Sequence, residues 1–456
     1  MPESAYDVIV IGSGPGGYVT AIRAAQLGFK TAVVEKDKVG GRCLNYACIP
    51  AKAVLRVADV LSEIREADEF GISVSAPSVD FGQVMERRGK VVQTLTGGVS
   101  GLFKKNKVDL IEGSGSIAGD GLVRVGDDTY TAKTIVLATG SVPRPIPGTT
   151  FGGRVIGTEE AWALSELPGS LAVIGSGASG SEIASAYVRL GSEVKLFEAL
   201  ERVLPAEDVD ISKLAERGFK KQGIDVHTGT LVTDVVSGKD SVSFKYGDQT
   251  GEAEWVVIAA GRGPDIEGLG LDAVGIAIDD RGLIVVDGAM RTNVPGIYAI
   301  GDLVPGPALA HKASDEGVIA VEDAAGLKTH PISYIDIPRA TFCTPNVASF
   351  GLTEQQARAQ GYDVAVGKVQ YGAVGAGTVY GDRQGLVKII GETQFGELLG
   401  GHIIGAKATD LIQELVNTKI LEGGYPEIAR TIHGHPTMSE ALMEAARAAD
   451  GWLIHG

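Results

Sequence analysis

The chain has 456 residues, enough for three or four domains, and its 41 Lys and Arg against 57 Asp and Glu give a net charge of −16. This charge argues against nucleic acid or an anionic membrane as a general partner. Three cysteines are too few for a secreted disulfide framework, and no run of 18 or more apolar residues predicts a membrane span. No basic residue precedes Arg23, so we expect no signal peptide and predict a protein of the reducing cytoplasm.

The chain contains an internal repeat. In each copy a short apolar strand precedes a G-x-G-x-x-G fingerprint, a helix-like segment and a second strand that ends in glutamate, at the same offset from the first glycine. One such fingerprint is a weak signal, but two in the same context are a strong one. The first copy comprises Tyr6–Ile11, Gly12, Gly14, Gly17, Tyr18–Leu27 and Thr31–Val34 with Glu35, and the second comprises Leu171–Ile174, Gly175, Gly177, Gly180 and Glu193–Phe197 with Glu198.

Both copies predict a dinucleotide site. The first glycine makes a tight turn, the second lets a pyrophosphate approach the backbone, and the third lets helix pack on strand. The helix N-terminus offers unpaired N–H groups to the phosphates. We expect Glu35 and Glu198 to accept hydrogen bonds from ribose hydroxyls, and the carboxylate of Glu198 to favour NAD over NADP.

Two of the three cysteines, Cys43 and Cys48, lie shortly after the first fingerprint. A metal site needs about four ligands, and no second Cys/His pair accompanies these two. We interpret them as a redox-active disulfide fed by a flavin; the alternative is a chance pair of core cysteines. Residues five apart on a regular helix point about 140° apart, so a bridge requires a distorted segment. Gly40-Gly41 and Pro50 supply the means for it.

The later segments predict the last strand of each Rossmann copy and the start of a further domain. Thr292–Asp302 is predicted as a strand that ends in Gly-Asp, and Asp302 either holds a cofactor sugar or is an ordinary turn aspartate. From about Ile332 the pattern predicts a separate α+β domain. The predicted strands are Thr134–Leu137 before Thr139 and Gly140, Trp255–Ile258 before Gly261, Leu386–Ile390 and Gly401–Ile404, and the predicted helices are Ala408–Glu422 and Ala441–Ala449.

A candidate acid/base pair lies near the C-terminus, where His435 is followed by Glu440. A disulfide–dithiol reaction needs a base that works near neutral pH, and histidine suits that role. Local sequence alone favours a surface histidine with a solvated glutamate. The cysteine pair changes that balance, because its chemistry has no other obvious base.

These motifs resemble the pyridine nucleotide–disulfide oxidoreductases over essentially the whole chain, and most closely the members that oxidise dihydrolipoamide. The resemblance rests on the two fingerprints, on Cys43-x4-Cys48-Ile-Pro-x-Lys52, on Gly301-Asp302, on Leu309–Ala313 and on His435-Pro-Thr through Glu440. It implies an α/β fold with two Rossmann-like domains, for FAD and NAD, and a C-terminal α+β dimerisation domain. The implied boundaries are 1–148 for FAD, 149–266 for NAD, 267–334 for a central segment completing the FAD site, and 335–456 for the interface of a homodimer.

The resemblance also implies residue roles. Cys43 would meet the substrate, and Cys48 would face the flavin. Lys52 would lie near the flavin N5 and pair with Glu182, while His435, held by Glu440, would reach the disulfide of the other subunit. The implied FAD residues are Gly12, Gly14, Gly17, Glu35, Lys52, Thr139, Gly140, Asp302 and Ala310, and the implied NAD residues are Gly175, Gly177, Gly180, Glu182, Glu198 and Gly261.

The implied reaction oxidises protein-bound dihydrolipoamide to lipoamide and reduces NAD+, with lipoyl domains of an acyltransferase or a glycine-cleavage carrier protein as partners. Ile22 stands where glutathione reductases carry arginine, which favours a neutral lipoamide arm. Three alternatives stay open: an NADH-dependent reductase of another small disulfide, a scaffold subunit of a multienzyme complex, and a plain flavin electron carrier. Arg42, Ala178-Ser179 and Tyr371–Tyr380 depart from the family pattern.

Overall fold

The computed structural model describes residues 5–456, which divide into two units. The first unit comprises the chain up to Val54 with Gly82–Arg144 and Gly261–Tyr334. The second comprises Leu55–Phe81, Pro145–Ala260 and Ile335–Gly456. The central segment that was predicted to complete the FAD site thus lies with the first Rossmann copy. Among residues 5–456 no helix is both long and apolar enough to cross a membrane.

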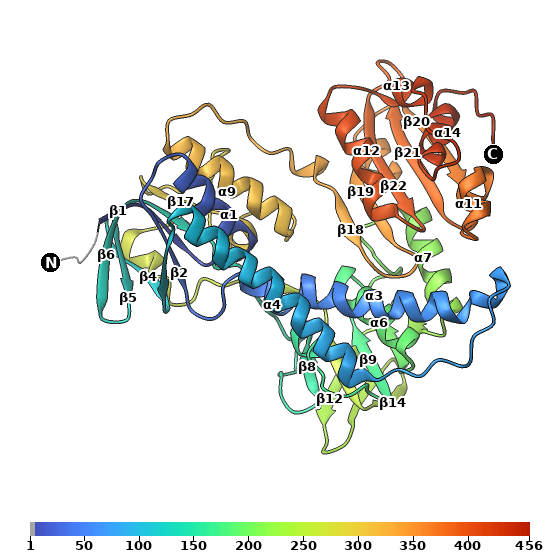
Figure 1. Ribbon diagram of the computed structural model, residues 1–456, viewed down its shortest axis with the longest axis horizontal. Helices are drawn as coiled ribbons and strands as arrows, with labels where there is room; N and C mark the ends of the chain where they lie inside the picture. Colours follow the sequence, from blue (N-terminus) through green and yellow to red (C-terminus); the bar gives the residue numbers. More distant parts are fainter. Residues whose placement is uncertain (1–4) are drawn as a thin grey trace. The chain divides into compact units, whose positions relative to one another are not determined.

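The first unit is built on a mixed seven-stranded sheet (Figure 1). Strand β1 lies between β2 and β6 and runs parallel to both, as a Rossmann strand that ends in a glycine turn should. The strands, in spatial order, are β3 (Asp109–Glu112), β2 (Thr31–Glu35), β1 (Ala5–Ile11), β6 (Asp128–Leu137), β5 (Leu122–Val125) and β4 (Gly115–Gly119), with β17 (Ile297–Ala299) paired to β6.

Helices cover one face of this sheet. Val8 and Val10 of β1 point into a core with α1 (Pro15–Gln26), α4 (Phe81–Asn106) and α9 (Ala310–Ala324), while Ile9 and Ile11 belong to a second core on the opposite face. A strand buried on both faces reads as a continuous apolar run, which is why Tyr6–Ile11 was recognisable in the sequence. The remaining elements of this unit are α2 (Gly41–Asn45), the start of α3 (Cys48–Arg65), β7 (Ser141–Pro143), β16 (Arg262–Pro264) and α8 (Leu271–Val274).

The second unit contains the second Rossmann copy, with β9 between β10 and β15 and parallel to both. This placement of β9 repeats that of β1. The parallel sheet has the order β11 (Asp225–His227), β10 (Glu193–Phe197), β9 (Ser170–Ile174), β15 (Trp255–Ile258) and β8 (Val155–Gly157); it is joined by β12 (Val232–Ser237), β13 (Val242–Tyr246), β14 (Gln249–Ala253), α5 (Thr158–Ala161), α6 (Ala178–Leu190) and α7 (Val209–Lys221).

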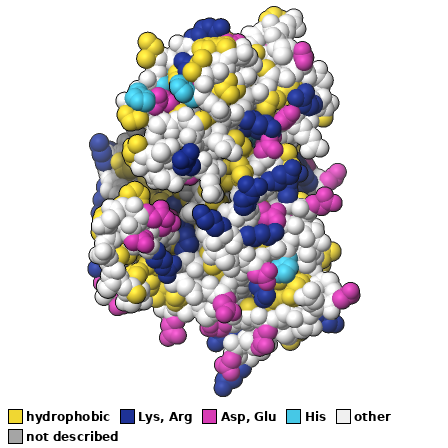
Figure 2. All heavy atoms as spheres, turned by 90° about the vertical axis from the view of Figure 1, so that its right-hand side faces the viewer, with side chains coloured by type: hydrophobic (Ala, Val, Ile, Leu, Met, Phe, Trp, Pro, Cys, Tyr) yellow, Lys and Arg dark blue, Asp and Glu magenta, His cyan; other side chains and the backbone are white. Residues whose placement is uncertain are grey.

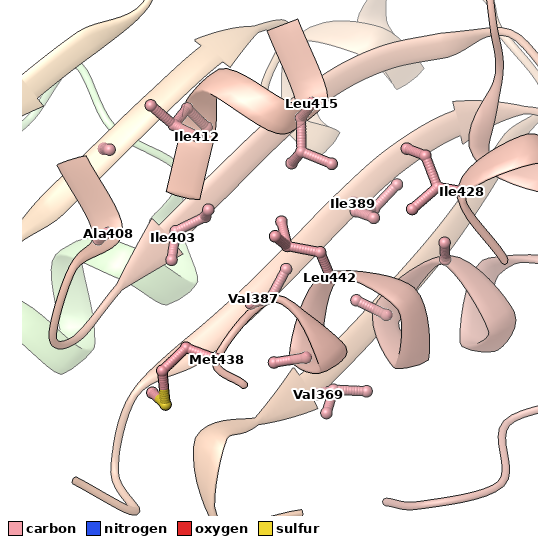
Figure 3. Close-up of a cluster of buried hydrophobic side chains, with 14 of the residues drawn as sticks. Val369, Val387, Ile389, Ile403, Ala408, Ile412, Leu415, Ile428, Met438 and Leu442 are labelled. Carbon is pink, nitrogen blue, oxygen red and sulfur yellow. The ribbon is translucent and has the colours of Figure 1, made fainter. Parts of the chain in front are cut away.

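The same unit ends in an antiparallel five-stranded sheet that packs helices against both of its faces. Figure 3 shows its core, in which Val387 and Ile389 of the sheet meet Leu415 and Leu442 from two helices. The elements are β18 (Arg339–Thr341), β19 (Val347–Gly351), β22 (Leu398–Ile404), β21 (Leu386–Glu392) and β20 (Val364–Gln370) in spatial order, with α10 (Glu354–Ala359), α11 (Gly375–Val379), α12 (Ala408–Ile420), α13 (Tyr425–Arg430) and α14 (Glu440–Ala449).

The predicted fold class is confirmed, and so are most predicted elements. One prediction was too long: within Thr292–Asp302 only Ile297–Ala299 is strand. Gly296 takes a positive φ of 79°, and the Ile297 N–H donates to the Val294 carbonyl, so a tight turn replaces the first half. Asp302 then lies in a short 3-10 helix, Gly301–Leu303, rather than at a strand end.

Candidate active site

The two fingerprints form matching turns, here named the first loop (Gly12–Gly17) and the second loop (Gly175–Gly180). The Gly12 N–H donates to the Val34 carbonyl and the Gly175 N–H to the Phe197 carbonyl, both at 2.8 Å. Helix α1 is capped by Gly14 and α6 by Gly177, and neither cap supplies a side-chain acceptor. The first N–H groups of both helices are therefore available to phosphate oxygens.

The third glycine of each loop is required by a close backbone approach. A Cβ on Gly17 would overlap the carbonyl oxygen of Gly12, and a Cβ on Gly180 would overlap that of Gly175. The helix can start this close to the strand end only because both residues lack a side chain. These contacts form the cradle that a dinucleotide pyrophosphate needs.

The glutamate at the end of the second strand of each repeat copy accepts the same hydrogen bonds in both copies. Ser13 donates to Glu35 Oε2 from its N–H at 2.9 Å and from its hydroxyl at 2.5 Å. Ser176 donates to Glu198 Oε2 at 2.9 and 2.7 Å from the same two groups. A carboxylate has about four acceptor positions, so each glutamate can still accept ribose hydroxyls. The serine was not singled out in the sequence, although it recurs at the same place in both copies.

Thr139 and Gly140 follow the end of β6, as predicted, and together they hold Asp265. The Thr139 hydroxyl donates to the Asp265 carbonyl at 2.6 Å, and the Asp265 N–H donates to the Gly140 carbonyl at 2.9 Å. The Asp265 carboxylate pairs with Lys36 at 2.7 Å, directly after Glu35. The ends of β2 and β6 are thus joined beside the first loop through a residue that the sequence did not indicate.

Asp302 is part of a hydrogen-bonded network. It accepts from the Ser141 hydroxyl at 2.5 Å, and the same hydroxyl accepts from Arg262 Nε at 2.9 Å. The preceding residue, Gly301, is held by a buried ion pair: Lys312 Nζ donates to its carbonyl and its N–H donates to Glu316, both at 2.7 Å. Both backbone groups of Gly301 are thus held by hydrogen bonds. The turn that carries Asp302 is therefore well ordered.

Cys43 and Cys48 are both thiols here and lie on either side of a helix break. Cys43 belongs to α2, Tyr46 leaves helical geometry with φ −130° and ψ −23°, and Cys48 begins α3. The distortion that the spacing required is confirmed, although it falls at Tyr46 and not at Pro50. A Cβ on Gly41 would come within 2.7 Å of Gly14, so the cysteine segment lies against the first loop.

The charge state of the pair is asymmetric. The pKa of Cys43 is raised, first by its hydrogen bond with Cys48 and then by burial, while the positive charges of Lys52 and Arg42 act to lower it. Cys43 therefore holds its proton strongly and donates it toward Cys48. Arg42, a departure from the family pattern, thus adds positive charge beside the thiols.

His435 and Glu440 form the predicted pair. His435 Nδ1 lies 2.9 Å from Glu440 Oε1, and 74% of the His435 side-chain surface is exposed. Burial raises the pKa of Glu440, but hydrogen bonds from the Thr437 N–H and from His435 outweigh it and lower the pKa. An ionised Glu440 fixes the proton on Nδ1, so Nε2 is the nitrogen left to accept a proton.

The other predicted residues lie as follows. Ala310 begins α9, so its N–H belongs to an open helix end. Glu182 is buried on α6, where its Oε1 accepts from the Phe342 N–H at 2.9 Å; its pairing with Lys52 stays a prediction. Gly261 follows the end of β15 and its carbonyl accepts from Arg144. Gly375, in the divergent segment Tyr371–Tyr380, would bring a Cβ within 3.6 Å of the His435 ring.

Charges of both signs are interspersed on the face drawn in Figure 2, and no single sign dominates it. The net charge of −16 is therefore not gathered into one field on this face.

Comparison with known protein families and with named relatives identifies the family of this chain. Residues 6–317 match the model of the pyridine nucleotide–disulphide oxidoreductases, and residues 337–446 match the dimerisation domain of that family. A Bacillus subtilis protein named dihydrolipoyl dehydrogenase is 43% identical, with 99% of each chain covered. One from Mycobacterium bovis with the same name is 44% identical, also with 99% of each covered.

Solved structures agree with this. LpdA from Mycobacterium tuberculosis superposes with a TM-score of 0.90 at 27% identity, covering 96% of this chain and 99% of that one. The flavoprotein disulfide reductase RclA from Escherichia coli, crystallised as a Cu(II) complex, gives a TM-score of 0.88 at 27% identity, covering 97% of this chain and 99% of that one. The resemblance inferred from the motifs is confirmed: this chain belongs to the pyridine nucleotide–disulphide oxidoreductase family.

Proposed function

We propose that this flavoprotein disulfide oxidoreductase is a dihydrolipoyl dehydrogenase, which oxidises dihydrolipoamide and reduces NAD+. The observation that carries the proposal is the thiol pair Cys43 and Cys48, hydrogen-bonded to each other and lying against the first nucleotide loop. Full-length relatives that carry this name support the choice of substrate.

The residues present fit both cofactors of the family, FAD and NAD. The first loop with Glu35, Asp302 and the Ala310 N–H would hold FAD, and the second loop with Glu198 would hold NAD. When bound, the flavin supplies two-electron transfer between a thiol pair and a nicotinamide. The chain supplies the cradle, the thiols and the base.

The thiol chemistry proceeds on this chain's own residues. His435 Nε2 takes a proton from one dihydrolipoamide thiol, and the thiolate attacks Cys43 Sγ of the oxidised pair. The Cys43–Cys48 bond breaks, and Cys48 leaves as a thiolate. The second substrate thiol, deprotonated in turn, attacks the substrate sulfur of the mixed disulfide and expels Cys43, which takes a proton. Lipoamide is released, and the enzyme is left with the Cys43 thiol and the Cys48 thiolate.

The asymmetry of the pair suits these two roles. Cys43 holds its proton strongly, so it takes up a proton when it leaves the mixed disulfide and attacks a disulfide only after a base removes that proton, which is the work of His435. We propose that the base is supplied by the second copy of a homodimer formed through the dimerisation domain. The protein partners would be lipoyl domains, met in the cytoplasm.

Single substitutions of the two cysteines test the proposal. Cys48→Ser and Cys43→Ser should each lower dihydrolipoamide:NAD+ turnover by at least about 1,000-fold, because the substitution leaves no disulfide to accept the electrons. Flavin reduction by NADH should persist in both. A Cys343→Ser control, at a buried thiol elsewhere in the chain, should keep its activity.

Two results would contradict the proposal. A Cys43→Ser protein that still oxidises dihydrolipoamide would indicate a plain flavin electron carrier. A wild-type protein that reduces other small disulfides with NADH, but does not oxidise dihydrolipoamide, would indicate a different substrate.

A further inference from the structure

A second histidine, His433, lies two residues before the proposed base His435. Its side chain is buried, whereas that of His435 is exposed. The side chain of His433 exposes 6% of its surface, whereas that of His435 exposes 74%. His435 is bonded through Nδ1 to Glu440, whereas His433 is bonded through both ring nitrogens. The proposed mechanism uses His435 only, and it leaves His433 unexplained.

Both partners of His433 are acceptors. Its Nδ1 lies 2.9 Å from the Thr431 carbonyl oxygen, and its Nε2 lies 2.7 Å from Glu414 Oε1. Neutral imidazole has one N–H donor and one acceptor nitrogen, so it can satisfy only one of these oxygens. The imidazolium satisfies both, and the geometry therefore indicates a charged ring.

The charges around His433 favour that state. The pKa of His433 is raised, first by the hydrogen bond to Glu414 on α12 and against the effect of burial. Arg447 on α14 opposes this increase, and Glu440 at the start of α14 is stabilised as a carboxylate by the His433 charge. The groups that face His433 are thus Glu414, Arg447 and Glu440, with two carboxylates against one guanidinium.

Glu414 has a fixed position because its helix, α12, packs into the hydrophobic core. Ile412 and Leu415 of α12 are buried, and Figure 3 shows them in the same cluster as Met438 and Leu442. Met438 and Leu442 hold the C-terminal side of the segment that presents His435. Between Arg430, where α13 ends, and Met438, the described structure ties this segment to α12 through His433.

We propose that His433 is a positioning residue for His435: tied to Glu414, it fixes the segment 431–437 so that the base and its carboxylate keep their alignment. This inference rests on the proposed function, in which His435 is the base. His433 touches neither substrate nor thiols in this account. It acts through the backbone of Gly434, the single residue between it and His435.

Variants of Glu414 in the FAD-loaded full-length protein test the proposal. Glu414→Ala removes the tether and should slow oxidation of a dithiol about 10-fold, since small misplacements of a catalytic group have large kinetic costs. Glu414→Gln keeps an amide that can bond Nε2 and should restore most of that rate. Flavin reduction by NADH, which does not use His435, should stay within about twofold of wild type in both. The matched control is Glu397→Ala, which removes the ion pair of Glu397 with Lys419 at the far end of the same helix.

The assay should use both dithiothreitol and dihydrolipoamide. A wild-type protein that oxidises dithiothreitol but not dihydrolipoamide contradicts the proposed substrate and still allows the variants to be compared. Nitrogen-15 NMR of the ring provides a readout without catalysis: His433 should show two protonated ring nitrogens at pH 7, and one in Glu414→Ala. The proposal is overturned if Glu414→Ala oxidises dithiols at the wild-type rate, if it slows both half-reactions equally, or if the wild-type ring carries one proton at pH 7.

Discussion

The first and second loops share a sequence pattern, backbone hydrogen bonds and a serine–glutamate pair, yet their surroundings differ. Gly16 in the first loop is approached by other residues: a Cβ there would come within 3.1 Å of Ala313 and Ile300. Ser179 takes the place of Gly16 in the second loop and is exposed, as are Gly177 and Ala178, whereas Gly16 is buried. One loop is enclosed by protein, and the other is open.

The enclosing element is α9, which packs against α1 (Figure 1). The two helices come so close that a Cβ on Gly317 would overlap the hydroxyl of Thr20. No helix in the described chain packs on α6 in this way at its N-terminal end. An enclosed site suits a cofactor that stays bound, and an open site suits one that is exchanged in each turnover. This difference supports the proposed placement of the resident flavin at the first loop and of the exchanging nicotinamide at the second.

The largest expected effect comes from the third glycine of each loop. Gly17→Ala should yield protein with little bound FAD, because the methyl group overlaps the Gly12 carbonyl and moves the helix end away from the phosphates. Gly180→Ala should remain yellow and instead raise the KM for NAD+ by at least about 10-fold. The 450 nm absorbance per chain and the KM for NAD+ measure the two outcomes.

The controls are Gly14→Ala and Gly177→Ala, at positions where a Cβ meets no atom. Both should fold with wild-type stability. If Gly17→Ala kept its flavin while Gly180→Ala lost it, the assignment of the two loops would be reversed.

A smaller effect is expected at the acid of the second copy. Glu198→Ala removes a charged acceptor and should weaken NAD+ binding by at least about 10-fold, since hydrogen bonds to charged groups contribute about 1.5–3 kcal/mol. Discrimination against NADP+ should fall, because the negative charge that repels the 2′-phosphate is gone. Steady-state kinetics with both nucleotides give the ratio of kcat/KM for NAD+ to that for NADP+. An unchanged ratio would show that Glu198 does not set the preference for NAD+.

The smallest effect is expected at Gly16, where the first loop contacts α9. Gly16→Ala adds a methyl group at 3.1 Å from α9 and should cost about 1–3 kcal/mol of stability by overpacking. Its thermal unfolding temperature should fall, while that of Gly177→Ala should not change. Equal stability of the two variants would show that α9 does not constrain the first loop.

The repeat was predictable because each copy carries its signals within a short stretch of chain. Strand β10 and strand β15 have the predicted bounds, and both glutamates lie beside the loops as expected. Local periodicity and glycine spacing are sufficient for these features. Ser13 and Ser176 could also have been found, since the repeat itself aligns them.

The partners that join distant segments could not be predicted. Asp265 reaches Lys36, and Glu316 reaches Gly301 and Tyr334, only because the sheet brings these segments together. The same holds for Glu414 and His433, which lie on different elements of the C-terminal core. Side-chain direction after folding, rather than residue type, decides such contacts.

The most direct test of the account is an anaerobic titration of the wild-type protein with dihydrolipoamide, followed by its visible spectrum. We expect a long-wavelength absorption band after two electrons, which would report a Cys48 thiolate beside the flavin, and loss of that band when NAD+ is added. No reduction by dihydrolipoamide, together with rapid reduction by NADH, would contradict the proposed function.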